Sequence, residues 1–228
     1  MIYITGDTHG DIDWSKLNTE NFPEQKNLTK KDYVIVCGDF GGVWNGNHKD
    51  NYVLNNFNNR NFTFLFIDGN HENFEALNSY PVEMWNGGKV HRIRDSIIHL
   101  MRGQIYTIDG ITFFTFGGAK STDKERRKEF ISWWKEEEPS YQEMNEGLDN
   151  LEKVGNKVDV ILTHTCPSEL IKVFDKYPIL EYQGQINTYL DEINERVEFE
   201  KWYFGHHHAD INLGRYRMLY QDVVKLEI

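Results

Sequence analysis

The sequence has 228 residues, of which 39% are hydrophobic and 14% aromatic. A chain of this length buries roughly 70–75% of its unfolded surface, which excludes extensive disorder and predicts a single domain over residues 1–228. Asp and Glu number 36 against 25 Lys and Arg, so the formal net charge of −11 disfavours binding to long nucleic acid or to anionic membranes.

Short apolar runs rich in β-branched and aromatic residues recur along the chain and predict strands that are covered on both faces. In chain order these predicted strands are Ile2–Thr5, Tyr33–Cys37, Phe62–Ile67, Ile111–Phe116, Val158–Thr163 and Trp202–Phe204. The predicted helices between them are Trp14–Asn18, Tyr52–Asn59, Asp123–Trp134, Tyr141–Lys153 and Asn187–Val197. Alternating strands and helices are typical of a layered α/β fold.

Two further pairs of alternating segments predict antiparallel strands, which would make the sheet mixed. The first pair is Ile97–Met101 with Gln104–Ile108, separated by an Arg-Gly turn. The second pair is Arg215–Gln221 with Val223–Ile228, at the end of the chain.

Side chains that can bind a metal follow the C-terminal ends of the predicted strands. They are Asp7, His9, Asp39, Asn70, His71, His164, His206 and His208. In open α/β sheets the carboxyl ends of neighbouring strands meet at one crevice, so we expect these residues to converge although they span some 200 positions of the sequence.

The types of these residues indicate the chemistry. Carboxylate and amide oxygens mixed with imidazole nitrogens suit Mn²⁺, Fe or Zn²⁺, and the absence of Cys ligands disfavours a structural zinc site. Even without His71, the candidate ligands are more numerous than one ion needs. Two cations roughly 3.5–4 Å apart that share a carboxylate can activate water and stabilise an in-line phosphoryl displacement. The sequence therefore predicts a binuclear hydrolase.

Five short motifs resemble, in order, those of the calcineurin-like metallophosphoesterases. They are Gly6-Asp7-Thr8-His9-Gly10-Asp11, Gly38-Asp39, Gly69-Asn70-His71-Glu72, Thr163-His164 and Gly205-His206-His207-His208. The resemblance implies a four-layer α/β/β/α sandwich with two mixed β-sheets. It also implies a phosphoester hydrolase with two divalent transition metal ions.

The same resemblance implies a role for each residue. Asp39 would bridge two metals, the first held also by Asp7, His9 and His208, and the second by Asn70, His164 and His206. A metal-bridging hydroxide would attack phosphorus. His71 would then protonate the departing oxygen as general acid, a role that suits an imidazole near neutral pH.

The sequence departs from the family pattern after Gly38-Asp39, where many members carry a second Asp and an Arg that grips phosphate. A substitute cation could come from the basic cluster around the predicted helix Asp123–Trp134. The cations of this cluster are Lys120, Lys124, Arg126, Arg127 and Lys128, of which Lys120 is the best placed because it follows the end of a predicted strand. The candidate substrate-binding residues are Asn70, Lys120, Arg126 and Arg127. A solvated helix face is the alternative interpretation of this cluster.

Three functions fit these motifs. A phosphomonoesterase acting on a phosphorylated substrate is expected first. A phosphodiesterase of the nuclease or cyclic-nucleotide type is the alternative, and a non-catalytic scaffold with the same fold is a third possibility. The presence of every expected ligand and of His71 disfavours the scaffold.

Cysteine content and apolar patterning predict where the protein resides. Cys37 and Cys166 lie far apart and outside any Cys-x-x-Cys motif, which is typical of a reducing compartment. The first residues lack the basic start and long apolar run of a signal peptide, and no later run reaches the length of a membrane span. We therefore expect a cytoplasmic protein without a membrane partner.

Overall fold

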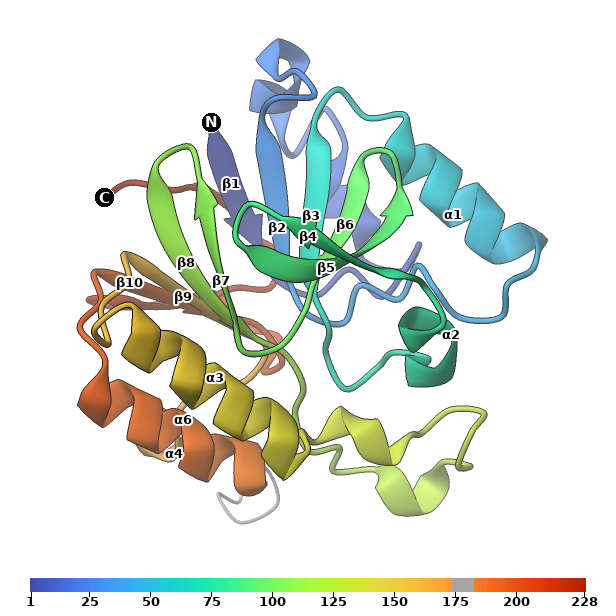
Figure 1. Ribbon diagram of the computed structural model, residues 1–228. Coiled ribbons are helices and arrows are strands. Elements are labelled where there is room, and N and C mark those ends of the chain that lie inside the picture. The colour runs from blue at the N-terminus through green and yellow to red at the C-terminus, as the bar shows by residue number, and fades with distance from the viewer. Residues whose placement is uncertain (174–182) are drawn as a thin grey trace.

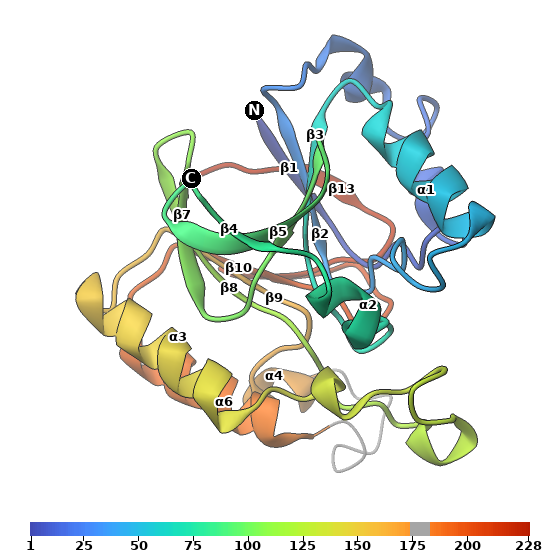
Figure 2. The ribbon, with the colours of Figure 1, turned by 45° about the vertical axis from the view of Figure 1, so that its right-hand side comes forward.

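The computed structural model describes residues 1–173 and 183–228 and contains two mixed β-sheets that pack face to face (Figures 1 and 2). The first sheet has the order β13 (Val223–Lys225), β1 (Ile2–Thr5), β2 (Tyr33–Cys37), β3 (Thr63–Ile67), β6 (Ile97–Leu100), β5 (Gly88–Arg94) and β4 (Val82–Trp85). The second has the order β11 (Ile211–Leu213), β12 (Tyr216–Met218), β10 (Lys201–Phe204), β9 (Val160–Thr163), β8 (Ile111–Phe116) and β7 (Gln104–Ile108).

Helices cover the outer face of each sheet, as Figure 2 shows for α1 on one side and α3 and α6 on the other. The α-helices are α1 (His48–Asn58), α2 (Phe74–Asn78), α3 (Tyr141–Lys153), α4 (Ser168–Ile171) and α6 (Gln185–Arg196). The 3₁₀ helices are η1 (Trp14–Leu17), η2 (Pro23–Asn27), η3 (Lys124–Arg126) and η4 (Lys135–Glu137). The predicted four-layer α/β/β/α sandwich is confirmed.

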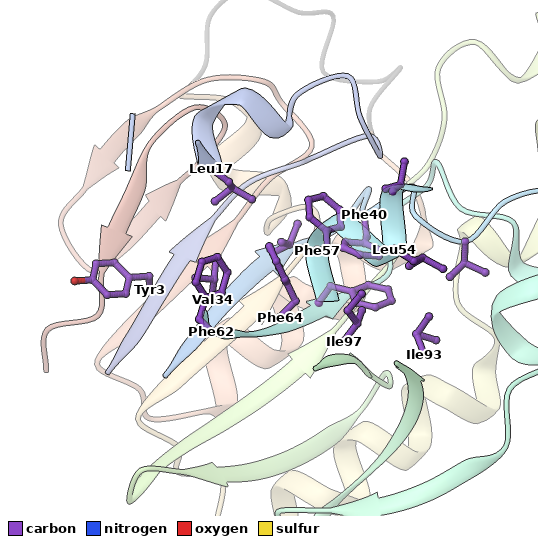
Figure 3. Packing of buried hydrophobic residues seen from close by; sticks show 14 of the residues in the cluster. Tyr3, Leu17, Val34, Phe40, Leu54, Phe57, Phe62, Phe64, Ile93 and Ile97 are labelled. Atoms are coloured by element: carbon purple, nitrogen blue, oxygen red, sulfur yellow. The ribbon is translucent and has the colours of Figure 1, made fainter. Parts of the chain in front are cut away.

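Burial on both faces explains why the strand sequences are continuously apolar. In β2, Val34 and Val36 point into the outer core beside α1, whereas Ile35 and Cys37 point into the core between the sheets. Figure 3 shows the outer core, in which Phe57 from α1 lies against the strand residue Phe64. A third core joins the second sheet to α3, α4 and α6.

Helix α3 has the predicted bounds because its start is specified locally. The Ser140 hydroxyl accepts a hydrogen bond from the backbone N–H of Glu143, and the Glu143 carboxylate accepts one from the backbone N–H of Ser140. This reciprocal capping satisfies two donors that the first helical turn leaves open.

Both predicted antiparallel pairs are wrong, because in each pair the two segments join different sheets. Strand β6 pairs with β3 and β5, whereas β7 pairs with β8. The Arg-Gly connection does not close a hairpin, since Arg102 turns inward and donates two hydrogen bonds to Asp68, at 2.8 and 2.6 Å. In the tail, β12 pairs with β10 and β11, and β13 pairs with β1.

The predicted helix over residues 123–134 is also wrong. Only the short η3 forms there, and the apolar residues do not share one buried face: Phe130 and Ile131 are exposed while Trp134 is buried. A helix without an apolar face to pack gains little from tertiary contacts. In the described part of the chain, no helix is both long and apolar enough to cross a bilayer.

Candidate metal centre and active site

The strand ends of both sheets converge on one site. Asp7, Asp39 and the Asn70-His71 pair follow β1, β2 and β3 of the first sheet, whereas His164 and the histidines after Gly205 follow β9 and β10 of the second. The expected convergence thus joins two sheets rather than neighbouring strands of one.

Asp39 lies at the centre of the candidate ligands. Its Oδ2 atom is 3.3 Å from His9 Nε2, and its Oδ1 atom is 3.4 Å from His164 Nε2. Three sets of side chains place potential ligand atoms within 4.8 Å of one another: Asp7, His9 and His208; Asp7, Asp39 and His164; and His9, Asp39 and His71. The Asp39 carboxylate lies between two imidazoles that belong to different sets. This is the position expected of a ligand that bridges two metal ions.

The remaining candidates border His164. Asn70 Oδ1 lies 3.0 Å from His164 Nε2, and the His206 ring lies with its centroid 5.0 Å from that of His164. Ser121, which sequence analysis missed, accepts a hydrogen bond from Asn70 Nδ2 at 3.0 Å and so directs the amide oxygen toward His164. All seven candidate ligands are therefore in one place, and their roles as ligands stay a prediction.

The carboxylates favour positive charge at the buried imidazoles. Burial alone would lower the pKa of His9 and His164, but Asp39 and Asp7 raise the pKa of His9 to about 9 and that of His164 to about 10. A metal ion competes with the proton for the same nitrogen lone pair, so surroundings that favour the imidazolium also favour a cation.

A buried carboxylate oxygen supports the fit of a divalent cation. Asp7 Oδ2 makes no hydrogen bond within the described part of the structure, although His208 Nε2 lies 3.1 Å away. Buried polar atoms are normally satisfied, and an unsatisfied one often marks an ion site. Together with a donor set of oxygen and imidazole nitrogen, this atom indicates that the residues fit a pair of divalent cations.

Glycines beside the motifs make room for ligand side chains from other loops. A Cβ atom on Gly69 would lie 2.0 Å from Asp39 Oδ1, and one on Gly205 would lie 2.2 Å from Asp7 Oδ1. Either contact would push a carboxylate out of place, so each of these two glycines makes room for a ligand of a different motif.

Four candidate ligands have left-handed backbone conformations, which are costly for residues other than glycine. The φ angles are 44° for His9, 45° for Asp39, 66° for His206 and 49° for His208. In this conformation the backbone turns sharply after the strand, so the ligand side chain points back toward the site.

A second layer of residues orients the ligands and was missed by sequence analysis. Asp13 Oδ2 lies 2.7 Å from His9 Nδ1, and its other oxygen accepts a hydrogen bond from the Tyr220 hydroxyl at 3.0 Å. The Tyr220 ring stacks on His208 with centroids 4.5 Å apart. Beneath them, buried Lys16 donates to backbone carbonyls that include that of Asp7. The spacing of Asp13 four residues after His9 was the available signal.

We expect Asp13→Ala to lower metal affinity roughly 10- to 100-fold, because the carboxylate that orients the His9 ring is lost. Titration of the protein with Mn²⁺ checks this. Asp11→Ala is the matched control, since Asp11 pairs with Lys49 rather than with a candidate ligand. Equal affinities for the two variants would contradict the orienting role.

A cleft of about 310 Å³ lies beside the candidate ligands. Its lining residues are Asp39, Asn70, His71, Thr122, Asp123, Arg127, His206, His207 and His208. Arg127 Nη2 donates a hydrogen bond to His71 Nε2 at 2.8 Å. Arg127 Nε also lies 2.8 Å from Asp123 Oδ1. This ion pair holds the guanidinium beside His71, the predicted general acid.

The other cations of the basic cluster do not line this cleft. Lys120 Nζ donates to the carbonyl of Gln183 at 3.2 Å, and Arg126 is exposed to solvent. A larger cavity, of about 1020 Å³, lies between β5, β7 and α3, and no candidate site residue lines it. Of the predicted substrate-binding residues, the structure therefore brings only Asn70 and Arg127 to the candidate site.

Comparison with known protein families shows the family to which the chain belongs. The sequence matches the calcineurin-like phosphoesterase family over residues 1–210. The chain belongs to this family. The groups of candidate metal-binding residues lie at the strand ends, where the motifs place them.

Two solved structures resemble the chain at low sequence identity. One is a Staphylococcus aureus protein assigned as a 5′-nucleotidase, in complex with α-ketoglutarate, with 14% identity and a TM-score of 0.48; the match covers 96% of this chain and 48% of that one. The other is the phosphopantetheinyl hydrolase of Mycobacterium tuberculosis, with 15% identity, a TM-score of 0.46 and coverage of 96% and 89%. The chain thus spans about half the length of the first. No protein of curated function matches the sequence.

Proposed function

We propose that this metallophosphoesterase is a phosphomonoesterase. The observation that carries the proposal is the position of Arg127, whose guanidinium lies against His71 in the cleft beside the candidate ligands. A phosphomonoester brings up to two negative charges to the site, whereas a diester brings one. A fixed guanidinium matches the extra charge and can bind two phosphate oxygens at once.

The substrate class follows from charge and size. A phosphorylated small molecule fits a cleft of about 310 Å³, and the net charge of −11 disfavours long nucleic acid. Mn²⁺, Fe or Zn²⁺ are the ions that the mixed oxygen and nitrogen donors favour.

In the proposed reaction, water replaces the alcohol on phosphorus. Two divalent cations, when bound, supply an activated water and stabilise the phosphoryl oxygens. The substrate phosphate replaces His71 Nε2 as the acceptor of the Arg127 guanidinium, so that this nitrogen is free to carry a proton. His71 gives that proton to the leaving oxygen as its bond to phosphorus breaks. The oxygen of water forms the new bond to phosphorus, and the proton that water loses restores His71. Monoester and water thus become alcohol and inorganic phosphate.

Arg127→Ala should lower kcat/KM for aryl phosphomonoesters tenfold to more than a hundredfold, the worth of a charge-assisted contact of about 1.5–3 kcal/mol. The loss for matched diesters should be smaller, because they carry one charge less. Kinetics on paired mono- and diesters with added Mn²⁺ measure both. Arg126→Ala is the control, since Arg126 is exposed and outside the cleft.

Two outcomes would overturn the proposal. A wild-type preference for diesters, with equal small effects of Arg127→Ala on both classes, would identify a phosphodiesterase. Bound metal without hydrolysis of any ester would identify a scaffold.

A further inference from the structure

A second cavity, of about 360 Å³, meets the cleft at His71. Its walls include His9, Ile12, Trp44, Lys49 and Val53. His71 is the only residue that lines both this cavity and the cleft that holds Arg127, among the residues described for each. One imidazole therefore separates two spaces of similar size.

The wall formed by Trp44 is fixed in place. The Asp50 carboxylate accepts hydrogen bonds from the backbone N–H groups of Trp44, Asn45 and Gly46, at 2.8, 2.6 and 2.8 Å. The Trp44 carbonyl accepts a hydrogen bond from Asn73 at 2.6 Å. Its indole packs edge to face on buried Trp134, with centroids 5.5 Å apart. A cavity whose wall is held from several sides needs no rearrangement to receive a ligand.

The composition of the walls indicates the chemistry of that ligand. Ile12, Trp44 and Val53 present apolar surface. The charged side chains of the lining have partners: Lys49 lies 3.3 Å from the carboxylate of Asp11, His9 lies 3.3 Å from that of Asp39, and the Asp50 carboxylate accepts hydrogen bonds from backbone N–H groups. The cavity, at about 360 Å³, exceeds the roughly 150 Å³ in which a protein can enclose benzene, so it has room for a substituted ring. A flat, uncharged ring fits these walls better than a second phosphate or a sugar chain.

We propose that this cavity binds the leaving group and selects phosphomonoesters whose alcohol carries a single flat ring. The inference rests on the proposed function. If Arg127 holds the phosphate and His71 protonates the departing oxygen, the rest of the leaving group extends from His71. The cavity beyond His71 is the space that receives it.

The test compares benzyl phosphate with ethyl phosphate, which both release an alkoxide of similar basicity and differ in the ring. Wild-type protein with added Mn²⁺ should prefer benzyl phosphate. Trp44→Ala should lower kcat/KM for benzyl phosphate about tenfold to a hundredfold, because the ring loses its apolar wall, and leave ethyl phosphate within about twofold. Trp133→Ala is the matched control, since Trp133 lines neither cavity.

A binding measurement and a second variant keep the inference testable if Trp44→Ala fails to fold. Ile12 is 73% exposed, so Ile12→Ser removes apolar wall without disturbing the core and should lower the benzyl preference a few-fold. Calorimetry with benzylphosphonate and ethylphosphonate, which cannot lose the alcohol, should show the same order of affinities.

The outcomes separate this inference from the function on which it rests. Equal wild-type rates for the two esters, or equal losses for both in the variants, would overturn the cavity assignment and leave the phosphomonoesterase intact. Failure of the wild type to hydrolyse either ester would overturn the proposed function itself.

Discussion

Asp39→Asn should remove both metal ions and reduce turnover at least about a thousandfold, since the ions supply several kcal/mol of transition-state stabilisation and each 1.36 kcal/mol is a factor of ten. The reason lies in the position of the carboxylate, between His9 at 3.3 Å and His164 at 3.4 Å. One neutral amide in that position would weaken two sites at once. Elemental analysis of the purified variant measures the occupancy.

Folding of this variant must be checked, because Asp39 also accepts a hydrogen bond from the backbone N–H of His71 at 2.7 Å. Asn retains one oxygen for that bond. Asp159→Asn is the matched control, a carboxylate that accepts hydrogen bonds from Thr112 at the opposite end of β9 from His164. A full complement of both ions in Asp39→Asn would show that the bridging ligand is another residue.

His71→Ala should keep its metal ions and lose about 10²–10⁴ in turnover, the usual contribution of a positioned general acid. The loss should shrink for nitrophenyl phosphate, whose leaving group departs without a proton. Rates for nitrophenyl and alkyl phosphates, with metal content measured on the same samples, provide the comparison.

The same experiment tests whether His71 is a metal ligand, because potential ligand atoms of His71, His9 and Asp39 lie within 4.8 Å of one another. Loss of an ion in His71→Ala would make it a ligand. Retained metal with equal losses for both leaving groups would assign His71 a role other than proton transfer. Thr122→Ala, also in the cleft but without a titratable group, is the control.

The part of the site that follows strand ends was predictable from sequence. Asp7, Asp39 and His164 each lie within two residues of the end of a short apolar strand, and the topology of the sheets brings such positions together. The residues that orient them were harder to find. Tyr220 lies in the segment between β12 and β13 and stacks on His208, and no local sequence pattern predicts that contact.

The errors in the fold have two different origins. The Asn86-Gly87 turn of the β4–β5 hairpin, with φ angles of 49° and 101°, was a signal present in the sequence and overlooked. The separation of β6 from β7 had no such signal, because it depends on the buried ion pair of Arg102 with Asp68, residues 34 positions apart. Local pattern specifies strands and turns, whereas the choice of sheet depends on distant partners.

Strained backbone at four candidate ligands would make the folded state of this protein depend on its metal supply. Each left-handed residue costs roughly 1–3 kcal/mol, against a typical total stability of about 5–15 kcal/mol. That cost is present with or without metal, whereas a bound cation stabilises only the folded chain. In a cell short of the metal, a larger fraction of the chains would be unfolded and open to proteases. The amount of folded protein would then rise and fall with the amount of metal available.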